Sequence, residues 1–350
     1  MTSTKDNFDP NGVGVANGNI FGFPVDEEEA NIVILPIPWD TTASFGKGTC
    51  RGPEQILEVS TQLDFYHPKL SKAYNTKVFM SHISQQGLMI NDEFEQKTTK
   101  YFEFIEHGGK LSEELAFQEL IKEVNEVQNS IKQQVKDYAE KAIKSNKIPA
   151  VLGGEHSVPL GLLEAINDQE KSFGVLQLDA HADLRDAYEG FEQSHASIFF
   201  NALKLDKLEK LVQVGIRDVA ECEIDLINQS KGRIKTFFDW DIKNELYKGK
   251  TWAQKVDEIV AELPQNVYVS FDIDVLDPSL CPNTGTPVSG GFKLEELTYL
   301  LFELVDSGRK IIGFDLCEVA NGKSEKDWDS NVGARVLWEL VVATELSRKD

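Results

Sequence analysis

The chain has 350 residues, and its 36 lysines and arginines against 58 aspartates and glutamates give a formal net charge of −22 at pH 7. Because nucleic acids and anionic membrane surfaces are both bound through basic side chains, this balance argues against either as a partner and favours small cations and metal ions. Hydrophobic residues make up 41% and charged residues 27%, which is an ordinary globular composition, so the acidity does not indicate disorder.

Short apolar runs alternate with longer amphipathic ones along the chain, a pattern typical of parallel strands joined by crossover helices. The clearest helix is predicted over 112–145, where apolar residues recur at spacings of three and four and Ser112 is expected near its start. A coiled-coil partner helix is the alternative interpretation of that stripe. In chain order we predict strands at 32–37, 78–82, 149–152, 173–178, 211–215, 234–237, 266–271 and 310–315, and further helices at 52–61, 158–167, 219–229, 294–307 and 329–344.

Together these elements predict a single three-layer α/β/α domain with a mostly parallel sheet of about eight strands, because no repeat or low-complexity linker divides the chain. We expect an N-terminal extension over 1–30, the domain over 31–350, and a surface insertion at about 91–110, which is charged and poorly periodic. Four scattered cysteines without a CxxC pair, and the lack of a signal-peptide core or a membrane-length apolar run, predict a soluble cytoplasmic protein.

Polar clusters directly follow three of the predicted strands. They are Gly-Gly-Glu-His-Ser at 153–157, Asp-Ala-His-Ala-Asp at 179–183 and Asp-Ile-Asp at 272–274. In an extended segment residues i, i+2 and i+4 share a face, and ligand sites of open α/β sheets lie beyond the carboxyl ends of the strands. An isolated Asp at a strand end is usually a cap or turn residue. Here six candidate ligands are expected to meet at one edge, namely His156, Asp179, His181, Asp183, Asp272 and Asp274.

The carboxylates of such a cluster would repel each other unless positive charge lay between them. A pair of divalent cations resolves the repulsion, and two imidazoles with several carboxylate oxygens form a hard donor set that suits Mn²⁺. Ligand type alone does not separate Mn²⁺ from Ni²⁺, so the cofactor is predicted as two Mn²⁺ per subunit with Ni²⁺ as the alternative. Paired metal ions of this kind activate water at neutral pH.

These motifs identify the sequence as similar to the ureohydrolase (arginase/agmatinase) family. Further matches are Ser-Phe-Asp-Ile-Asp-Val-Leu-Asp-Pro at 270–278, Thr-Gly-Thr-Pro-Val-Ser-Gly-Gly at 284–291 and Gly-Phe-Asp-Leu-Cys-Glu-Val at 313–319. The resemblance implies an arginase-like fold, a binuclear metal site on the six ligands above with Asp179 and Asp272 bridging, and hydrolysis of a guanidino group to urea and an amine or ammonia. It also implies catalytic roles for Glu318, which would face the guanidinium, for His195, which would shuttle a proton, and for Asp183.

The sequence predicts the reaction but supports several different substrates. The loop 184–194 resembles agmatinases, and its acidic Asp186, Glu189 and Glu192 would suit a cationic tail, whereas Arg185 would suit a carboxylate. The segment 284–288 is more like arginases. An N-terminal arm or Trp39 near the pocket would favour free guanidine, and formimidoylglutamate is a further option. The resemblance also implies a homo-oligomer, a trimer or hexamer. Outside this reaction class, a metal-dependent deacetylase and a non-catalytic polyamine binder are the alternatives.

Overall fold

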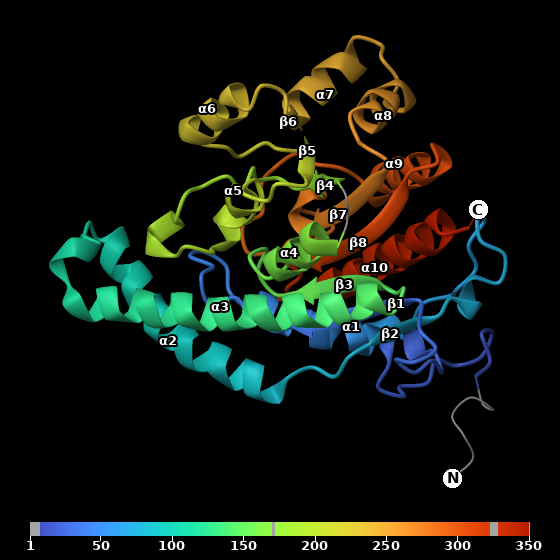
Figure 1. Cartoon of the computed structure of the whole chain (residues 1–350), viewed down its shortest axis with the longest axis horizontal. Coiled ribbons are helices and arrows are strands. Elements are labelled where there is room, and N and C mark those ends of the chain that lie inside the picture. The colour runs from blue at the N-terminus through green and yellow to red at the C-terminus, as the bar shows by residue number, and fades with distance from the viewer. Residues whose placement is uncertain (1–7, 170–171, 323–327, 350) are drawn as a thin grey trace.

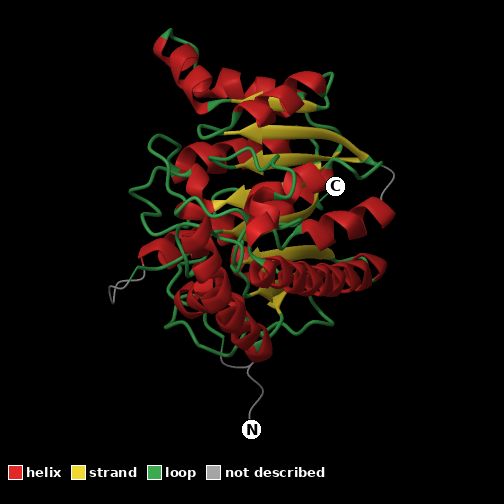
Figure 2. Cartoon of the chain, turned by 90° about the vertical axis from the view of Figure 1, so that its left-hand side faces the viewer, coloured by secondary structure: helices red, strands yellow, loops and turns green. Residues whose placement is uncertain are grey.

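A single parallel sheet forms the centre of the computed structural model, which describes residues 8–169, 172–322 and 328–349 (Figures 1 and 2). Within those residues eight strands pair in the order β2-β1-β3-β8-β7-β4-β5-β6, and every pairing is parallel. The strands are β1 (Ile32–Ile37), β2 (Val78–Met80), β3 (Ile148–Gly153), β4 (Phe173–Leu178), β5 (Leu208–Val214), β6 (Ile234–Phe237), β7 (Asn266–Asp272) and β8 (Lys310–Cys317).

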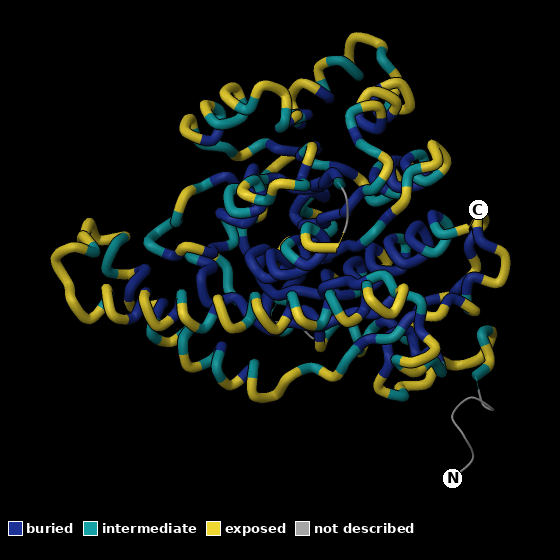
Figure 3. The backbone as a smooth tube through the Cα atoms, viewed as in Figure 1, coloured by how far each residue is buried: buried dark blue, intermediate teal, exposed yellow. Residues whose placement is uncertain are grey.

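Helices cover both faces of this sheet and bury its strands, as Figure 3 shows by the dark blue interior. One hydrophobic core lies between the sheet and α1, α8, α9 and α10, and the other lies between the sheet and α2, α3, α4 and α5. The predicted three-layer architecture with a parallel sheet of about eight strands is therefore confirmed. The helices are α1 (Gly52–Ser60), α2 (Gln85–Glu106), α3 (Leu115–Lys144), α4 (Leu160–Gln169), α5 (Ile198–Ala202), α6 (Glu221–Gln229), α7 (Asp239–Tyr247), α8 (Trp252–Ala261), α9 (Leu294–Asp306) and α10 (Trp328–Ser347).

The stretch 91–110 is largely helical, which its sequence pattern did not indicate. It forms most of α2, and two inward positions of that helix carry the polar residues Asn91 and Thr98, both fully buried. Asn91 exchanges hydrogen bonds with the backbone N–H and the carboxylate of Asp40, at 2.8 and 2.9 Å. These buried polar positions interrupt the apolar periodicity that predicts an amphipathic helix. The proposal that this segment is an insertion stays a prediction.

Helix α3 begins at Leu115, three residues after the expected start. Ser112 lies instead in a separate 3₁₀ turn over Leu111–Glu113 and makes no cap to α3. Helices α5, α7 and α8 were not predicted, and each has ten residues or fewer. No helix in the described ranges is both long and apolar enough to cross a bilayer.

The described part of the N-terminal extension is bound to the edge strand β2. The Asn19 side chain accepts a hydrogen bond from the Met80 N–H at 2.9 Å and donates to the Val78 carbonyl at 3.2 Å. Phe21 and Phe23 are buried beside it, each with a ring centroid within about 6 Å of the Trp338 ring. The extension therefore covers a sheet edge that would otherwise expose unpaired backbone groups.

Candidate metal centre

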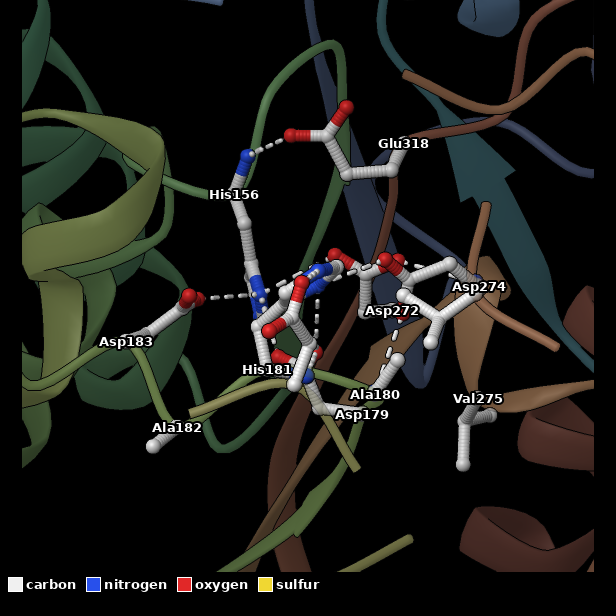
Figure 4. A network of polar contacts seen from close by, with 12 residues as sticks. His156, Asp179, Ala180, His181, Ala182, Asp183, Asp272, Asp274, Val275 and Glu318 are labelled. Carbon is white, nitrogen blue, oxygen red and sulfur yellow. Dashed lines mark hydrogen bonds and ion pairs between the residues drawn. The ribbon is translucent and has the colours of Figure 1, made fainter. Parts of the chain in front are cut away.

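The three polar clusters predicted to converge, together with Glu318, follow four strands that are consecutive in the sheet order, β3-β8-β7-β4. His156 follows β3, the segment 179–183 follows β4, Asp272 closes β7 and Glu318 follows β8. Figure 4 shows the imidazoles and carboxylates of these segments meeting at one place. The structure thus brings all six candidate ligands together at the carboxyl edge of the sheet, where open α/β folds bind their ligands.

His156 stands at the centre of the first group of side chains. Its Nδ1 lies 3.0 Å from an oxygen of Asp183, 3.1 Å from one of Asp179 and 3.3 Å from one of Asp272. All four side chains are at least 95% buried. None of these contacts has hydrogen-bond geometry, so Nδ1 lacks a hydrogen-bond partner among the described residues.

His181 organises the second group in the same way. Its Nδ1 lies 2.9 Å from Asp274 Oδ2 and 3.7 Å from Asp179 Oδ1. Asp179 therefore belongs to both groups, with Oδ2 toward His156 and Oδ1 toward His181. Asp274 Oδ2 is buried and, like His156 Nδ1, lacks a hydrogen-bond partner in the described part of the chain. Orphaned donors and acceptors at the centre of a carboxylate cluster fit two divalent cations, and each group supplies at least three ligand atoms.

Burial and the neighbouring charges shift the pKa values of the clustered carboxylates. Burial and the nearby charge of Asp179 raise the pKa of Asp183 to about 7. Burial and the charge of Asp274 raise the pKa of Asp272 well above its usual range. Burial also opposes ionisation of Asp274, but His181 outweighs it and lowers the pKa of that carboxyl to about 2. Cations bound here would displace the protons that the cluster otherwise holds.

Two residues of the site have left-handed backbone conformations that side chains rarely adopt. The φ angles of Asp183 and Glu318 are 54° and 63°. Backbone bonds hold both residues, because Asp183 accepts from the Phe199 N–H at 3.1 Å and Glu318 donates to the Gly154 carbonyl at 2.8 Å. Such strain costs about 1–3 kcal/mol per residue and concentrates at functional sites.

Glu318 stands to one side of the cluster (Figure 4). Its Oε1 accepts a hydrogen bond from the backbone N–H of His156 at 2.8 Å. The other oxygen borders Gly285, where an added Cβ would lie 3.3 Å from Oε2. Glycine at 285 therefore keeps the second face of this carboxylate open. Burial and the charge of Glu155 raise the pKa of Glu318 well above its usual range.

His195 begins a 3₁₀ turn over His195–Ser197 in the loop after β4. Its backbone N–H donates to the Thr42 hydroxyl at 3.2 Å, and that hydroxyl donates to the buried Glu155 at 2.7 Å. The imidazole stands edge-on to the Tyr188 ring, with centroids 6.0 Å apart. Burial and the neighbouring His181 lower the pKa of His195 to about 4, so its ring is neutral at pH 7.

A cavity of about 310 Å³ opens over these residues. Its lining includes His156, His181, Asp183, His195, Asp272 and Glu318. We call the remaining lining residues the outer wall, which includes Ser44, Phe45, Arg185, Tyr188, Asp218 and Glu223. Phe45 is 81% exposed at the mouth. Arg185 Nε lies 3.3 Å from the buried carboxylate of Glu223, so this guanidinium already has an anionic partner.

The cavity corrects several expectations about its walls. Asp186, Glu189 and Glu192 do not line it, and neither do Trp39 or the described residues of the N-terminal extension. Apart from the metal-centre carboxylates and Glu318, the acidic residues in its lining are Asp218 and Glu223. Asp218 lies just beyond the carboxyl end of β5, so the strand-end rule that identified the metal cluster also predicts it. The predicted strand 211–215 ends before Asp218 and the predicted helix 219–229 begins after it, so no role is predicted for this residue.

Comparisons with known proteins agree with this architecture. The family model described as the arginase family matches residues 30–343. An agmatinase of Bacillus cereus is 28% identical over 90% of this chain and 92% of its own, and an N(1)-aminopropylagmatine ureohydrolase of Thermus thermophilus is 31% identical over 85% of each. The crystal structure of the agmatine ureohydrolase of Thermoplasma volcanium superposes with a TM-score of 0.71 at 21% identity, over 99% of this chain and 98% of that one.

Proposed function

The chain belongs to the arginase family, and from this premise we propose that it is a binuclear-metal ureohydrolase that releases urea from a guanidino substrate. The observation that carries the proposal is the position of Asp179, whose two oxygens face two separate histidine–carboxylate groups. The relatives are named agmatinase and aminopropylagmatine ureohydrolase, so their names support the same chemistry.

We assign one cation to His156, Asp179, Asp183 and Asp272, and the other to Asp179, His181 and Asp274. Mn²⁺ is the proposed ion and Ni²⁺ its alternative, because oxygen-rich sites with imidazoles accept both. When bound, the pair supplies water activated for attack at neutral pH. Neither group of ligands contains a cysteine, and a ligand set without sulfur suits a hard cation.

Glu318 and His195 act on the substrate in this proposal. Oε1 of Glu318 is fixed by the His156 N–H, so its open oxygen is oriented for the N–H groups of a planar guanidinium, a charge-assisted pairing. His195 is neutral at pH 7, so its ring can take a proton from the attacking water and pass it to the departing nitrogen. Both residues line the cavity together with Phe45, which is 81% exposed.

The outer wall favours a substrate with a cationic tail, such as agmatine. Asp218 is part of that wall, and its side chain is 70% exposed with only a distant contact to His181 Nε2 at 3.9 Å. Arg185 would have to leave Glu223 to receive a carboxylate, which weighs against arginine and formimidoylglutamate. The argument for free guanidine loses its basis, because neither Trp39 nor the described part of the extension narrows the cavity. A cytoplasmic location and a trimeric or hexameric assembly belong to the same proposal.

The direct test is to remove metal with a chelator, reload with Mn²⁺ or separately with Ni²⁺, and measure urea and ammonia from agmatine, arginine, guanidinobutyrate and guanidine. We expect urea from agmatine in excess of the other substrates, and no turnover in the chelated protein. Full turnover after chelation would refute the metal mechanism. Failure on every guanidino compound, with hydrolysis of an acetylated polyamine, would move the protein to a different reaction class. Native mass measurement tests the assembly.

A further inference from the structure

The loop that carries His195 contains two residues in a backbone conformation that side chains rarely adopt. Ala187 and Glu189 have φ angles of 46° and 54°, in the left-handed region. Tyr188 lies between them, and both Tyr188 and His195 line the cavity. Backbone strain of this kind persists only where surrounding contacts enforce it. The shape of this part of the cavity therefore depends on contacts that hold the loop from outside.

Helices α2 and α3 supply such contacts to the backbone of the loop. The hydroxyl of Tyr101 on α2 donates a hydrogen bond to the Glu189 carbonyl at 2.9 Å. The side-chain oxygen of Asn125 on α3 accepts a hydrogen bond from the Glu192 N–H at 3.0 Å. Polar side chains of the helical layer thus bind backbone groups of the strained segment directly.

Gln128 continues this set of contacts one turn further along α3. Over the whole described length of that helix the buried residues are apolar apart from Gln128, which is 4% exposed. Its Nε2 donates to the Gln193 carbonyl and lies 3.5 Å from Oε1 of Glu155. The carbonyl can only accept, so Gln128 directs the amino group of its amide, and not the oxygen, at the loop. A buried amide in an apolar stripe is costly unless its hydrogen bonds are made, so packing alone does not account for glutamine here.

A second route leads from Gln128 back to the same loop. The hydroxyl of Thr42 donates to Glu155 at 2.7 Å and accepts from the His195 backbone N–H at 3.2 Å. Thr42 and Glu155 are fully buried. Gln193 precedes His195 by two residues, so the hydrogen bonds and the chain together close a ring around Gln128. The backbone of His195 is consequently held from two sides.

We propose that Gln128 is a positioning residue, which fixes the backbone of His195, and with it the imidazole that lines the cavity, by binding Gln193 and Glu155. This inference rests on the proposed function and deepens it, because it assigns the support of the proton-transferring group to α3. Most other buried residues of α3 belong to a hydrophobic core, so the helix is a firm base for the loop. A misplacement of about 1 Å at a reacting group can lower the rate about 10²-fold.

The test is a double-mutant cycle of Gln128→Met with His195→Asn, measured as kcat for urea release from agmatine by the Mn²⁺-loaded protein. Methionine keeps the length of the side chain and removes the donor. We expect Gln128→Met alone to lower kcat about 10–100-fold with the metal content unchanged. In the His195→Asn background the same substitution should lower kcat by less than about twofold, because the group that it positions is already lost.

Hydrogen exchange of the metal-free proteins gives a readout that does not depend on activity. In Gln128→Met the amides of 188–195 should exchange about tenfold faster than in the unaltered protein. The matched control is Val135→Ala, a buried position two turns further along the same helix. It should lower thermal stability while kcat and the exchange of this loop stay unchanged, so a general loss of stability cannot imitate the effect.

Several outcomes would overturn the positioning role. They are an unchanged kcat in Gln128→Met, an equal loss of kcat with and without His195→Asn, a loss of metal, or unchanged exchange of the loop. If Gln128→Met does not fold, Thr42→Val decides by the same cycle, and Thr42→Ser, which keeps the hydroxyl, should restore kcat. Absence of turnover by the unaltered protein would instead refute the proposed function, and hydrogen exchange would still decide whether Gln128 holds the loop.

Discussion

Replacing Asp179 by Asn should separate a shared metal ligand from an ordinary buried carboxylate. At a free Mn²⁺ concentration 1,000 times the dissociation constant, each site stabilises the folded state by about 4 kcal/mol. An unfolding entropy of about 2 cal/mol/K per residue gives a chain of 350 residues about 0.7 kcal/mol/K, so each site should raise the melting temperature by about 6 °C. The unaltered protein is thus expected to gain about 11 °C from two sites.

Asp179→Asn should abolish nearly all of that gain, because the two oxygens of Asp179 face both histidine–carboxylate groups. Asp183→Asn should halve it, because Asp183 contacts only His156. The exposed Asp241 on α7 supplies the control, since Asp241→Asn should retain the full gain. Scanning calorimetry of the chelated and Mn²⁺-loaded proteins measures all three. An undiminished gain in Asp179→Asn would refute the shared ligand, and a gain lost equally in both variants would refute the assignment of Asp183 to one site.

Three further substitutions test other parts of the molecule. His195→Asn should lower kcat by about 10²–10⁴-fold with the metal content unchanged, and metal loss measured by mass spectrometry would make His195 a ligand instead. Asp218→Asn should raise KM for agmatine about threefold without changing KM for guanidine, which has no tail to contact this exposed carboxylate. Burial raises the pKa of Glu339 from 4.5 to about 7, so the folded state binds this proton more tightly and loses stability as pH rises through 7. Glu339→Gln should therefore have the same unfolding free energy as the unaltered protein at pH 4 and exceed it by about 3 kcal/mol at pH 8. Urea titrations measure both values. If the variant and the unaltered protein were equally stable at pH 8 as well as at pH 4, the raised pKa would be contradicted.

The strands and the metal cluster were predictable because both depend on local patterns. Continuous apolar runs such as Ile32–Ile37 and Phe173–Leu178 have the composition of buried parallel strands, and their bounds in the structure agree with the prediction. The period of two in 179–183 placed Asp179, His181 and Asp183 on one side of the chain, and the sheet order then supplied the other strands. The local sequence is sufficient to predict a feature when a single strand or its extended end determines the positions of the side chains.

The parts that sequence reasoning missed depend on contacts between distant segments. Asn91 in α2 is buried because Asp40 accepts and donates to it across 51 positions. The sequence alone indicates an unpaired cation at Arg185, yet in the structure its guanidinium forms an ion pair with Glu223. The role of Gln128 depends on the loop after β4 that α3 contacts, which no local pattern specifies. In each case the role of a polar side chain depends on a partner that only the tertiary fold brings into contact with it.

The centre combines several features that each disfavour the folded state without cations. Carboxylates are buried together, Asp183 and Glu318 hold left-handed backbone conformations, and Asp274 Oδ2 lacks a hydrogen-bond partner in the described structure. A pair of divalent cations offsets the repulsion and supplies the missing partner at once. Removing one negative charge from the cluster should therefore stabilise the metal-free protein while it abolishes metal binding, so Asp179→Asn is expected to melt above the unaltered protein under chelation and below it with Mn²⁺. The two curves would cross only if the carboxylates are assembled for a cation, and a variant less stable in both conditions would show that Asp179 serves the fold instead.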